Sequence, residues 1–261
     1  MLYYFYSKVI YFSQIQKEEV INKFMTNIEI LNYIYELNQK YMANDGNGIY
    51  ASGPNYTIIN GNIPILLSAP HAVRSFKSGK AKGSDALTGS IVEYLCSRTG
   101  AFGIIRTFNL NDEPNSENNG HGLEYKKAII NLVNTKDIGG FIDIHGCKET
   151  HPFDFDIGTN NGLNLNGTPE YLDIILKRLS AIGKAVVDKE FKASLDTNIC
   201  NYIGRRTNLP ALQIEINSRM RKNTKNLLEL LGCFDRIIKE LSKEIEKKRT
   251  KEDIEVLIES R

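Results

Sequence analysis

The sequence predicts an α/β fold, a three-layer α/β/α sandwich in which helices cover both faces of a central mixed sheet. Apolar, strand-like runs alternate along the chain with segments whose apolar residues recur at helical spacing. One run, residues 63–68, is almost continuously apolar, which is typical of a central strand covered on both faces. The length of 261 residues suits one such domain.

The composition is that of an ordinary globular protein, and it excludes several classes of function. The net charge of +2 gives no field suited to binding nucleic acid. No apolar stretch approaches the roughly 20 residues needed to span a bilayer. The four cysteines are scattered without CxxC spacing, which indicates a reducing compartment. We therefore expect a cytoplasmic protein with neither a nucleic-acid nor a membrane partner, while the oligomeric state stays open.

Residues 1–24 are a candidate N-terminal extension. They are rich in aromatic residues and interrupted early by Lys8, so a secretory signal fits poorly. Two interpretations stay open: translation starts at Met25, or these residues form a hydrophobic helix that packs on the domain. We expect residues 25–261 to form a single domain with a helical C-terminal tail, because no repeat or domain boundary is evident.

The individual elements follow from local patterns. Residues 26–43 predict a helix with Thr26 as its N-cap, and two apolar runs around Asn60–Gly61 predict a hairpin. Residues 73–85 are rich in Gly, Ser and Lys and predict a loop. Further helices are predicted at 85–96 with Ser84 as cap, at 124–133, at 169–191 and from 224 onward, and further strands at 102–108, 139–146, 153–159 and 210–217.

Reactive side chains stand on three of the predicted strands. The run 63–69 leads into His71, the run 141–144 ends at His145, and the run 212–216 carries Glu215. In sheets of this class, ligands bind beyond the carboxyl ends of the strands. Asp85 starts the helix after the first of these strands, and it can lie beside His71 if the intervening loop folds back.

Two histidines and one carboxylate form a typical ligand set for a catalytic zinc ion, which keeps a fourth position for water. We predict that His71, Asp85 and His145 bind Zn²⁺. Bound zinc lowers the pKa of water to about 7, and a separate carboxylate must then accept the proton. Glu215 is the candidate general base, because a lone glutamate in an apolar strand is costly without a role. Asp143 is expected either to orient a metal ligand or to cap a nearby helix.

Four motifs occur in order along the chain: SAPHAV with a following SD, FIDIHG, FDFDIGT and LQIEIN. Together they resemble the N-formylglutamate amidohydrolase family, which is related to the zinc carboxypeptidases and the aspartoacylase-like deacylases. The resemblance covers roughly residues 56–235. It implies a mixed sheet between helices, one zinc ion, and hydrolysis of an amide next to a carboxylate. It also implies His71, His145 and Asp85 as zinc ligands and Glu215 as the general base.

A substrate carboxylate needs a cation, and arginine is favoured because its guanidinium can bind a carboxylate with two hydrogen bonds. Arg106 ends a predicted strand beside the site, and Arg219 follows the last strand. We expect these two side chains to bind a small anionic substrate. Arg205 and Arg206 are further candidates, in the loop before the last strand.

Three functions follow from this pattern. The first is a zinc-dependent amidohydrolase that cleaves the C–N bond of a small N-acyl amino acid, outside peptide bonds. The second is a carboxypeptidase-like peptide hydrolase that uses the same zinc site. The third is a metal- or ligand-binding domain without turnover, because fold does not dictate function. The presence of all four positions that the chemistry needs favours an enzyme.

Overall fold

The centre of the molecule is a seven-stranded sheet in the order β1-β5-β2-β6-β9-β7-β8. A computed structural model describes residues 25–77 and 79–259, so both interpretations of residues 1–24 lie outside the described residues. The strands are β1 (Tyr56–Ile59), β2 (Ile63–Ala69), β5 (Ala101–Arg106), β6 (Gly140–Cys147), β7 (Phe155–Gly158), β8 (Ala185–Val187) and β9 (Ala211–Asn217).

The middle of the sheet is parallel, and its flanks make it mixed. β5, β2, β6 and β9 run in one direction, whereas β1 is antiparallel to β5 and β7 is antiparallel to β9. β8 is parallel to β7. The carboxyl ends of β2, β6 and β9 therefore meet at one edge, where ligands bind in sheets of this class.

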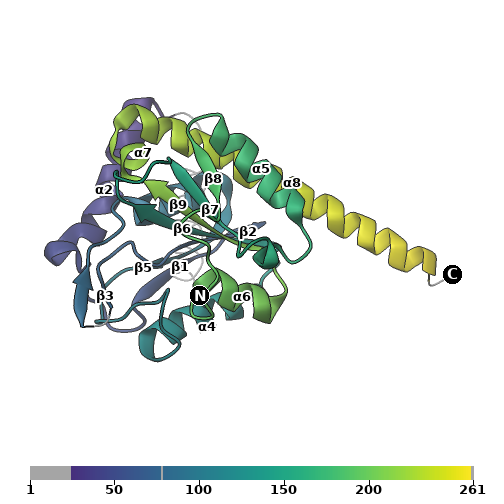
Figure 1. Ribbon diagram of the computed structural model, residues 1–261, viewed down its shortest axis with the longest axis horizontal. Coiled ribbons are helices and arrows are strands. Elements are labelled where there is room, and N and C mark those ends of the chain that lie inside the picture. Colours follow the sequence, from purple (N-terminus) through teal and green to yellow (C-terminus); the bar gives the residue numbers. More distant parts are fainter. Residues whose placement is uncertain (1–24, 78, 260–261) are drawn as a thin grey trace, which may run out of the picture.

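Helices cover both faces of the sheet (Figure 1). One face carries α2 (Asn27–Gly46), α3 (Thr88–Thr99), α5 (Pro169–Ser180) and α8 (Thr224–Glu259), and the other carries α4 (Gly120–Thr135) and α6 (Ile199–Thr207). The last turns of α8 extend beyond the body of the molecule (Figure 1). The predicted three-layer α/β/α sandwich with a mixed sheet is confirmed. Within the described ranges, no helix is long and apolar enough to cross a membrane.

The alternation of side chains along a strand decides which face receives the polar groups. In β6, Phe141 packs in the core under α4 and α6, and Asp143 and His145 follow it on the same face. Gln213 and Glu215 of β9 lie directly opposite these two residues in the register. One layer of the sandwich is therefore apolar towards the start of these strands and polar towards their ends.

The predicted hairpin around Asn60–Gly61 is wrong. β1 and β2 are not neighbours, because β5 lies between them, antiparallel to β1 and parallel to β2. The backbone N–H groups of Asn62 and Ile63 instead donate to the carbonyl of Gly100 at 2.8 and 3.2 Å. The local turn was identified, but the strand that pairs with β1 comes from later in the chain.

Several other boundaries differ from the predicted ones. The helix expected at 169–191 ends at Ser180, because the chain then forms β8 and pairs with β7. α6 was not predicted at all. The expected loop at 73–85 contains a two-stranded hairpin of β3 (Ser75–Lys77) and β4 (Lys80–Lys82). α3 begins at Thr88 after Leu87, whose φ is +73°, so Ser84 is not its cap.

A buried aspartate fixes the loop after β8. The carboxylate of Asp156 accepts the backbone N–H groups of Lys189, Glu190 and Phe191 at 3.1, 2.7 and 3.0 Å. Asp156 is fully buried, so these donors replace the water that its charge would otherwise need. Residues 190–195 of this loop form one wall of the cavity described below. The position of that wall therefore depends on Asp156.

We predict that Asp156→Ala lowers the free energy of unfolding by about 2–4 kcal/mol, because three backbone donors lose a charged acceptor. Urea denaturation of the metal-free protein measures the change. Asp173→Ala, at an exposed position on α5, is the matched control and should stay within about 0.5 kcal/mol of the wild type. Equal effects of the two substitutions would contradict the role given to Asp156.

Candidate metal centre

Three side chains from distant parts of the chain converge on one point. The Nδ1 atoms of His71 and His145 lie 3.1 Å apart. Oδ2 of Asp85 lies 3.3 Å from Nδ1 of His71 and 3.6 Å from Nδ1 of His145. All three residues are buried, and one ligand atom from each lies within 4.8 Å of the others. The structure thus brings together the three residues predicted to bind the metal.

Neighbouring backbone segments position these three side chains. His71 follows β2, and His145 lies near the end of β6, which is the adjacent parallel strand. Asp85 precedes α3, and its backbone N–H donates to the carbonyl of His71 at 2.8 Å. The carboxylate of Asp85 in turn accepts the N–H of Gly146 at 3.0 Å. The loop at 73–85 therefore folds back and fastens Asp85 to both histidine-bearing segments.

The second nitrogen of each imidazole contacts a buried carboxylate. Nε2 of His71 lies 2.5 Å from Oε1 of Glu113, and Nε2 of His145 lies 2.8 Å from Oδ2 of Asp143. Such contacts hold the proton on the outer nitrogen and leave Nδ1 to face a metal. Burial alone would lower the pKa of His145, but the charge of Asp143 raises it well above its ordinary value, so a metal that binds at Nδ1 would displace a proton. Of the two roles left open for Asp143, the structure shows the contact with the histidine.

Glu113 was missed in the sequence. It stands in a polar loop with two other acids, Asp112 and Glu117, and no pattern separates it from them. In the structure its carboxylate also accepts the hydroxyl of Ser75 at 2.8 Å. Burial would raise the pKa of Glu113, but the charge of His71 and its hydrogen bonds hold it well below its ordinary value. Glu113 is therefore an ionised partner of the imidazole.

The donor set fits a zinc ion. Two imidazole nitrogens and a carboxylate oxygen bind zinc at about 2.0–2.2 Å, so two ligands on a tetrahedral ion lie roughly 3.3–3.5 Å apart. The observed separations of 3.1, 3.3 and 3.6 Å are close to this. The ammonium of Lys82 lies 3.2 Å from Nδ1 of His71, so a cation already stands beside these donor atoms.

Asp85 has the protonation state that a metal ligand needs. Burial would raise the pKa of this carboxyl group, but hydrogen bonds with His145 and His71 hold it well below its ordinary value. A carboxylate binds metal only in its ionised form, so these contacts prepare Asp85 for coordination.

Glu215 lies across from His145 on β9 and lines the cavity beside the donor set. Nε2 of Gln213 donates to Oε1 of Glu215 at 3.1 Å, and Nδ2 of Asn198 donates to Gln213 at 2.7 Å. Burial raises the pKa of Glu215 to about 7, although the charge of His145 opposes the shift. A carboxylate with a pKa near neutrality can both accept and release a proton during a reaction.

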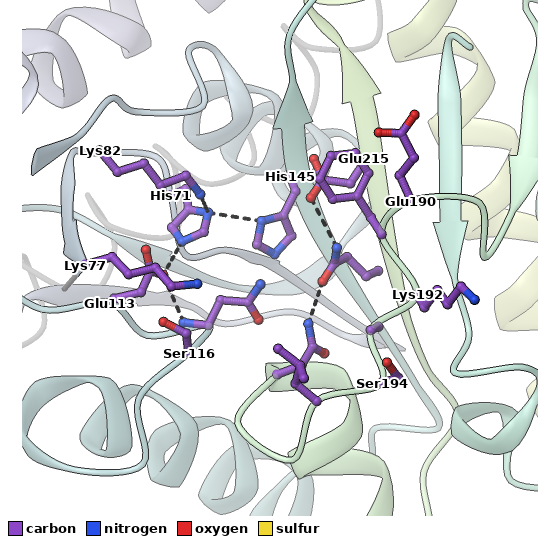
Figure 2. A pocket seen from close by; sticks show the side chains of 16 residues that line it. His71, Lys77, Lys82, Glu113, Ser116, His145, Glu190, Lys192, Ser194 and Glu215 are labelled. Atoms are coloured by element: carbon purple, nitrogen blue, oxygen red, sulfur yellow. Dashed lines mark hydrogen bonds and ion pairs between the residues drawn. The ribbon is translucent and has the colours of Figure 1, made fainter. Parts of the chain in front are cut away.

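A cavity of about 410 Å³ opens onto this centre (Figure 2). His71, His145 and Glu215 line it, together with two lysines of the β3–β4 hairpin, residues 190–195, and Glu113, Asn115 and Ser116. The volume falls within the range of about 300–1,000 Å³ that is typical of small-molecule sites. His71, His145 and Glu215 therefore border a space that suits a ligand of modest size.

The glycine behind His145 makes room for Arg221. A Cβ atom on Gly146 would lie 2.5 Å from the guanidinium carbon of Arg221. The buried guanidinium donates hydrogen bonds to the backbone carbonyls of Ala86, Cys147 and Ile216. These carbonyls belong to the turn after Asp85, to β6 and to β9. Arg221 therefore ties together three segments that carry residues of the site.

Neither arginine predicted to bind substrate lines the cavity. Arg106 is fully buried, lies 2.6 Å from the carboxylate of Asp112, and donates to the carbonyl of Pro70. Arg219 pairs with Asp154 at 2.5 Å. Both charges are held by internal partners, which the sequence could not reveal. Contact of either side chain with a substrate stays a prediction.

Comparison with known proteins shows what this architecture resembles. No protein-family model and no curated protein matches the sequence. The structure of N-formylglutamate amidohydrolase from Ralstonia eutropha JMP134 is similar, with a TM-score of 0.55 and 12% identity over 75% of this chain and 100% of that one. The gene product Atu2144 from Agrobacterium tumefaciens has a TM-score of 0.55 and 11% identity over 74% and 95% of the two chains. The likeness establishes the fold.

A third similar structure, a metallo-carboxypeptidase from Burkholderia cenocepacia, has a TM-score of 0.47 and 9% identity over 83% of this chain and 69% of that one. The first of the three proteins bears the name of the family that the sequence motifs resemble. At identities this low the two matches with a TM-score of 0.55 describe architecture alone, so function has to be argued from the site.

We predict that Glu113→Gln lowers the affinity for zinc about 10–100-fold, because the outer nitrogen of His71 loses its charged partner. Competition with a chelating dye at fixed pH measures the affinity. Glu124→Gln is the matched control, since Glu124 is exposed and contacts His121 away from the site. Unchanged zinc affinity in Glu113→Gln would contradict the role of this carboxylate.

We expect Gly146→Ala to destabilise the protein by about 1–3 kcal/mol and to weaken zinc binding, because the new methyl group displaces Arg221. Gly83→Ala serves as the control, since an added Cβ there meets no atom within 4 Å. Urea denaturation and zinc titration of both variants check the outcome. A Gly146→Ala protein with wild-type stability would show that Arg221 can move without consequence.

Proposed function

We propose that this protein is a zinc-dependent hydrolase that cleaves the amide bond of a small N-acyl amino acid. The observation that carries the proposal is the position of Glu215. It stands beside a buried His–Asp–His donor set at an accessible cavity, and burial raises its pKa to about 7. The order of the sequence motifs and the fold shared with an amidohydrolase support the same function.

The residues of the centre divide into two groups. His71, Asp85 and His145 would hold the metal, while Glu113 and Asp143 keep the two imidazoles oriented. When bound there, zinc supplies positive charge that polarises the amide carbonyl and lowers the pKa of a water molecule.

Glu215 moves the proton. Its carboxylate accepts a proton from the attacking water and passes it to the amide nitrogen as the C–N bond breaks. A pKa near 7 suits both transfers, because the carboxylate is basic enough to accept the proton and the carboxylic acid is acidic enough to release it. Gln213, itself held by Asn198, fixes one carboxylate oxygen and so orients the other.

A second candidate function uses the same centre. The cavity of about 410 Å³ also has room for the end of a short peptide. A carboxypeptidase-like activity is therefore an alternative function. A domain that binds metal or ligand without turnover is the remaining alternative. Assays on formyl-, acetyl- and succinyl-amino acids and on short peptides separate these functions.

We predict that Glu215→Gln lowers kcat about 10²–10⁴-fold with zinc still bound, because the glutamine side chain cannot accept the proton of the attacking water. Glu190→Gln is the matched control on the same cavity, where Glu190 contacts His151 at 2.9 Å, and it should keep kcat within a few-fold. Steady-state kinetics and metal analysis of each purified variant provide the measurements.

Two outcomes would count against the proposal. Loss of zinc together with activity in Glu215→Gln would make Glu215 a metal ligand instead of a base. Zinc-loaded wild-type protein that hydrolyses no acyl amino acid would point to the peptide hydrolase or to the binding domain, depending on whether it cleaves short peptides. Removing zinc with a chelator should abolish turnover, and adding zinc back should restore it.

A further inference from the structure

The cations that line the cavity are lysines, although the sequence favoured arginine. Among the described residues of its wall, the basic side chains other than histidine are Lys77, Lys82 and Lys192. Two buried arginines are held by other groups: Arg106 by Asp112, and Arg221 by backbone carbonyls. Recognition of an anionic substrate therefore falls to a lysine.

Two of the three lysines are less suited to this recognition. The ammonium of Lys82 lies 3.2 Å from Nδ1 of His71, within the group of metal-binding atoms. Lys192 extends away from the two histidines in the view of Figure 2.

Lys77 has the position and the free charge that recognition needs. Its side chain points from β3 towards the middle of the cavity (Figure 2). It is exposed, and no residue that the structure describes forms an ion pair with it. The nearby carboxylate of Glu113 is already bonded to His71 and Ser75. Water therefore solvates the ammonium of Lys77, and a ligand carboxylate can replace that water.

The base of the hairpin holds Lys77 at a fixed place relative to the centre. The hydroxyl of Ser75 donates to Glu113 at 2.8 Å, and the backbone N–H of Phe76 donates to the carbonyl of Asp112 at 3.1 Å. Glu113 also holds His71, so one carboxylate links the hairpin strand to a metal-binding imidazole. The backbone that carries Lys77 is thereby fastened to the segments that carry the metal-binding atoms.

We propose that Lys77 is a specificity-determining residue whose ammonium binds a substrate carboxylate. This inference rests on the proposed function, and it places the recognition of a side-chain carboxylate of the substrate at Lys77. A lysine ammonium is a compact charge with three donors, so it can bind a carboxylate from several directions. Lys77 contributes to substrate affinity, and the proton transfers stay with Glu215.

Lys77→Gln tests the proposal, with Lys80→Gln as the matched control. Lys80 lies directly opposite Lys77 in the hairpin register, is exposed, and is not among the residues that line the cavity. Zinc-loaded proteins are compared on N-formyl-L-glutamate and N-formyl-L-glutamine. Lys77→Gln should raise KM for the glutamate compound about tenfold, because a hydrogen bond to a charged group is lost. Its kcat and its kinetics on the glutamine compound should stay within about twofold, and Lys80→Gln should match the wild type on both.

The proposal is overturned if Lys77→Gln behaves as the wild type, if it affects both compounds equally, or if Lys80→Gln has the same effect. Calorimetric titration of the zinc-loaded proteins with glutarate separates this inference from the proposed function, because it needs no turnover. Binding that is lost in Lys77→Gln and kept in Lys80→Gln supports Lys77 even if neither formyl compound is hydrolysed. Glutarate that does not bind the wild type, or binds Lys77→Gln equally well, overturns the proposal whether or not the enzyme is active.

Discussion

The contact between each buried imidazole and a carboxylate is the constraint on which the site depends. Two Nδ1 atoms that face each other at 3.1 Å cannot both carry a proton without repulsion. Glu113 and Asp143 accept the outer N–H groups, so the inner nitrogens can present lone pairs. Lone pairs that converge in a buried space are unfavourable unless a cation lies between them. The arrangement is therefore understandable as a cation site, and Asp85 supplies its negative charge.

The sheet topology provides this arrangement through two simple rules. Parallel order brings the carboxyl ends of β2, β6 and β9 together, so residues far apart in the chain share one edge. The two-residue period of a strand then repeats Phe141, Asp143 and His145 on one face, with the apolar residue deepest. Arg221 fixes the strand ends by filling the space that Gly146 leaves open. The polar centre is thus packed on the core at Phe141, and the guanidinium of Arg221 fixes the strand ends next to it.

The residues that end or directly follow a strand-like apolar run, with the acid that starts the next helix pattern, were predictable from the sequence, and those inside polar segments were not. His145 and Glu215 are conspicuous because they interrupt apolar runs, and the edge rule then groups them with His71 and Asp85. Glu113 and Lys77 stand among similar residues in polar segments, where only tertiary contacts distinguish them. Tertiary contacts also explain why the predicted hairpin at 60–61 is wrong. The local residues form a turn, but β5 lies between β1 and β2 and pairs with both.

The different use of arginine and lysine follows from the shapes of the two side chains. A guanidinium offers five donors in a rigid plane, which suits Arg106 and Arg221 to holding several carbonyls or a carboxylate in the interior. Those bonds fix the segments that carry the site, and they engage both guanidinium groups. A lysine on a hairpin keeps its charge in solvent until a ligand replaces that water. The guanidinium groups of Arg106 and Arg221 therefore stabilise the site, whereas the ammonium of Lys77 stays available to bind a substrate carboxylate.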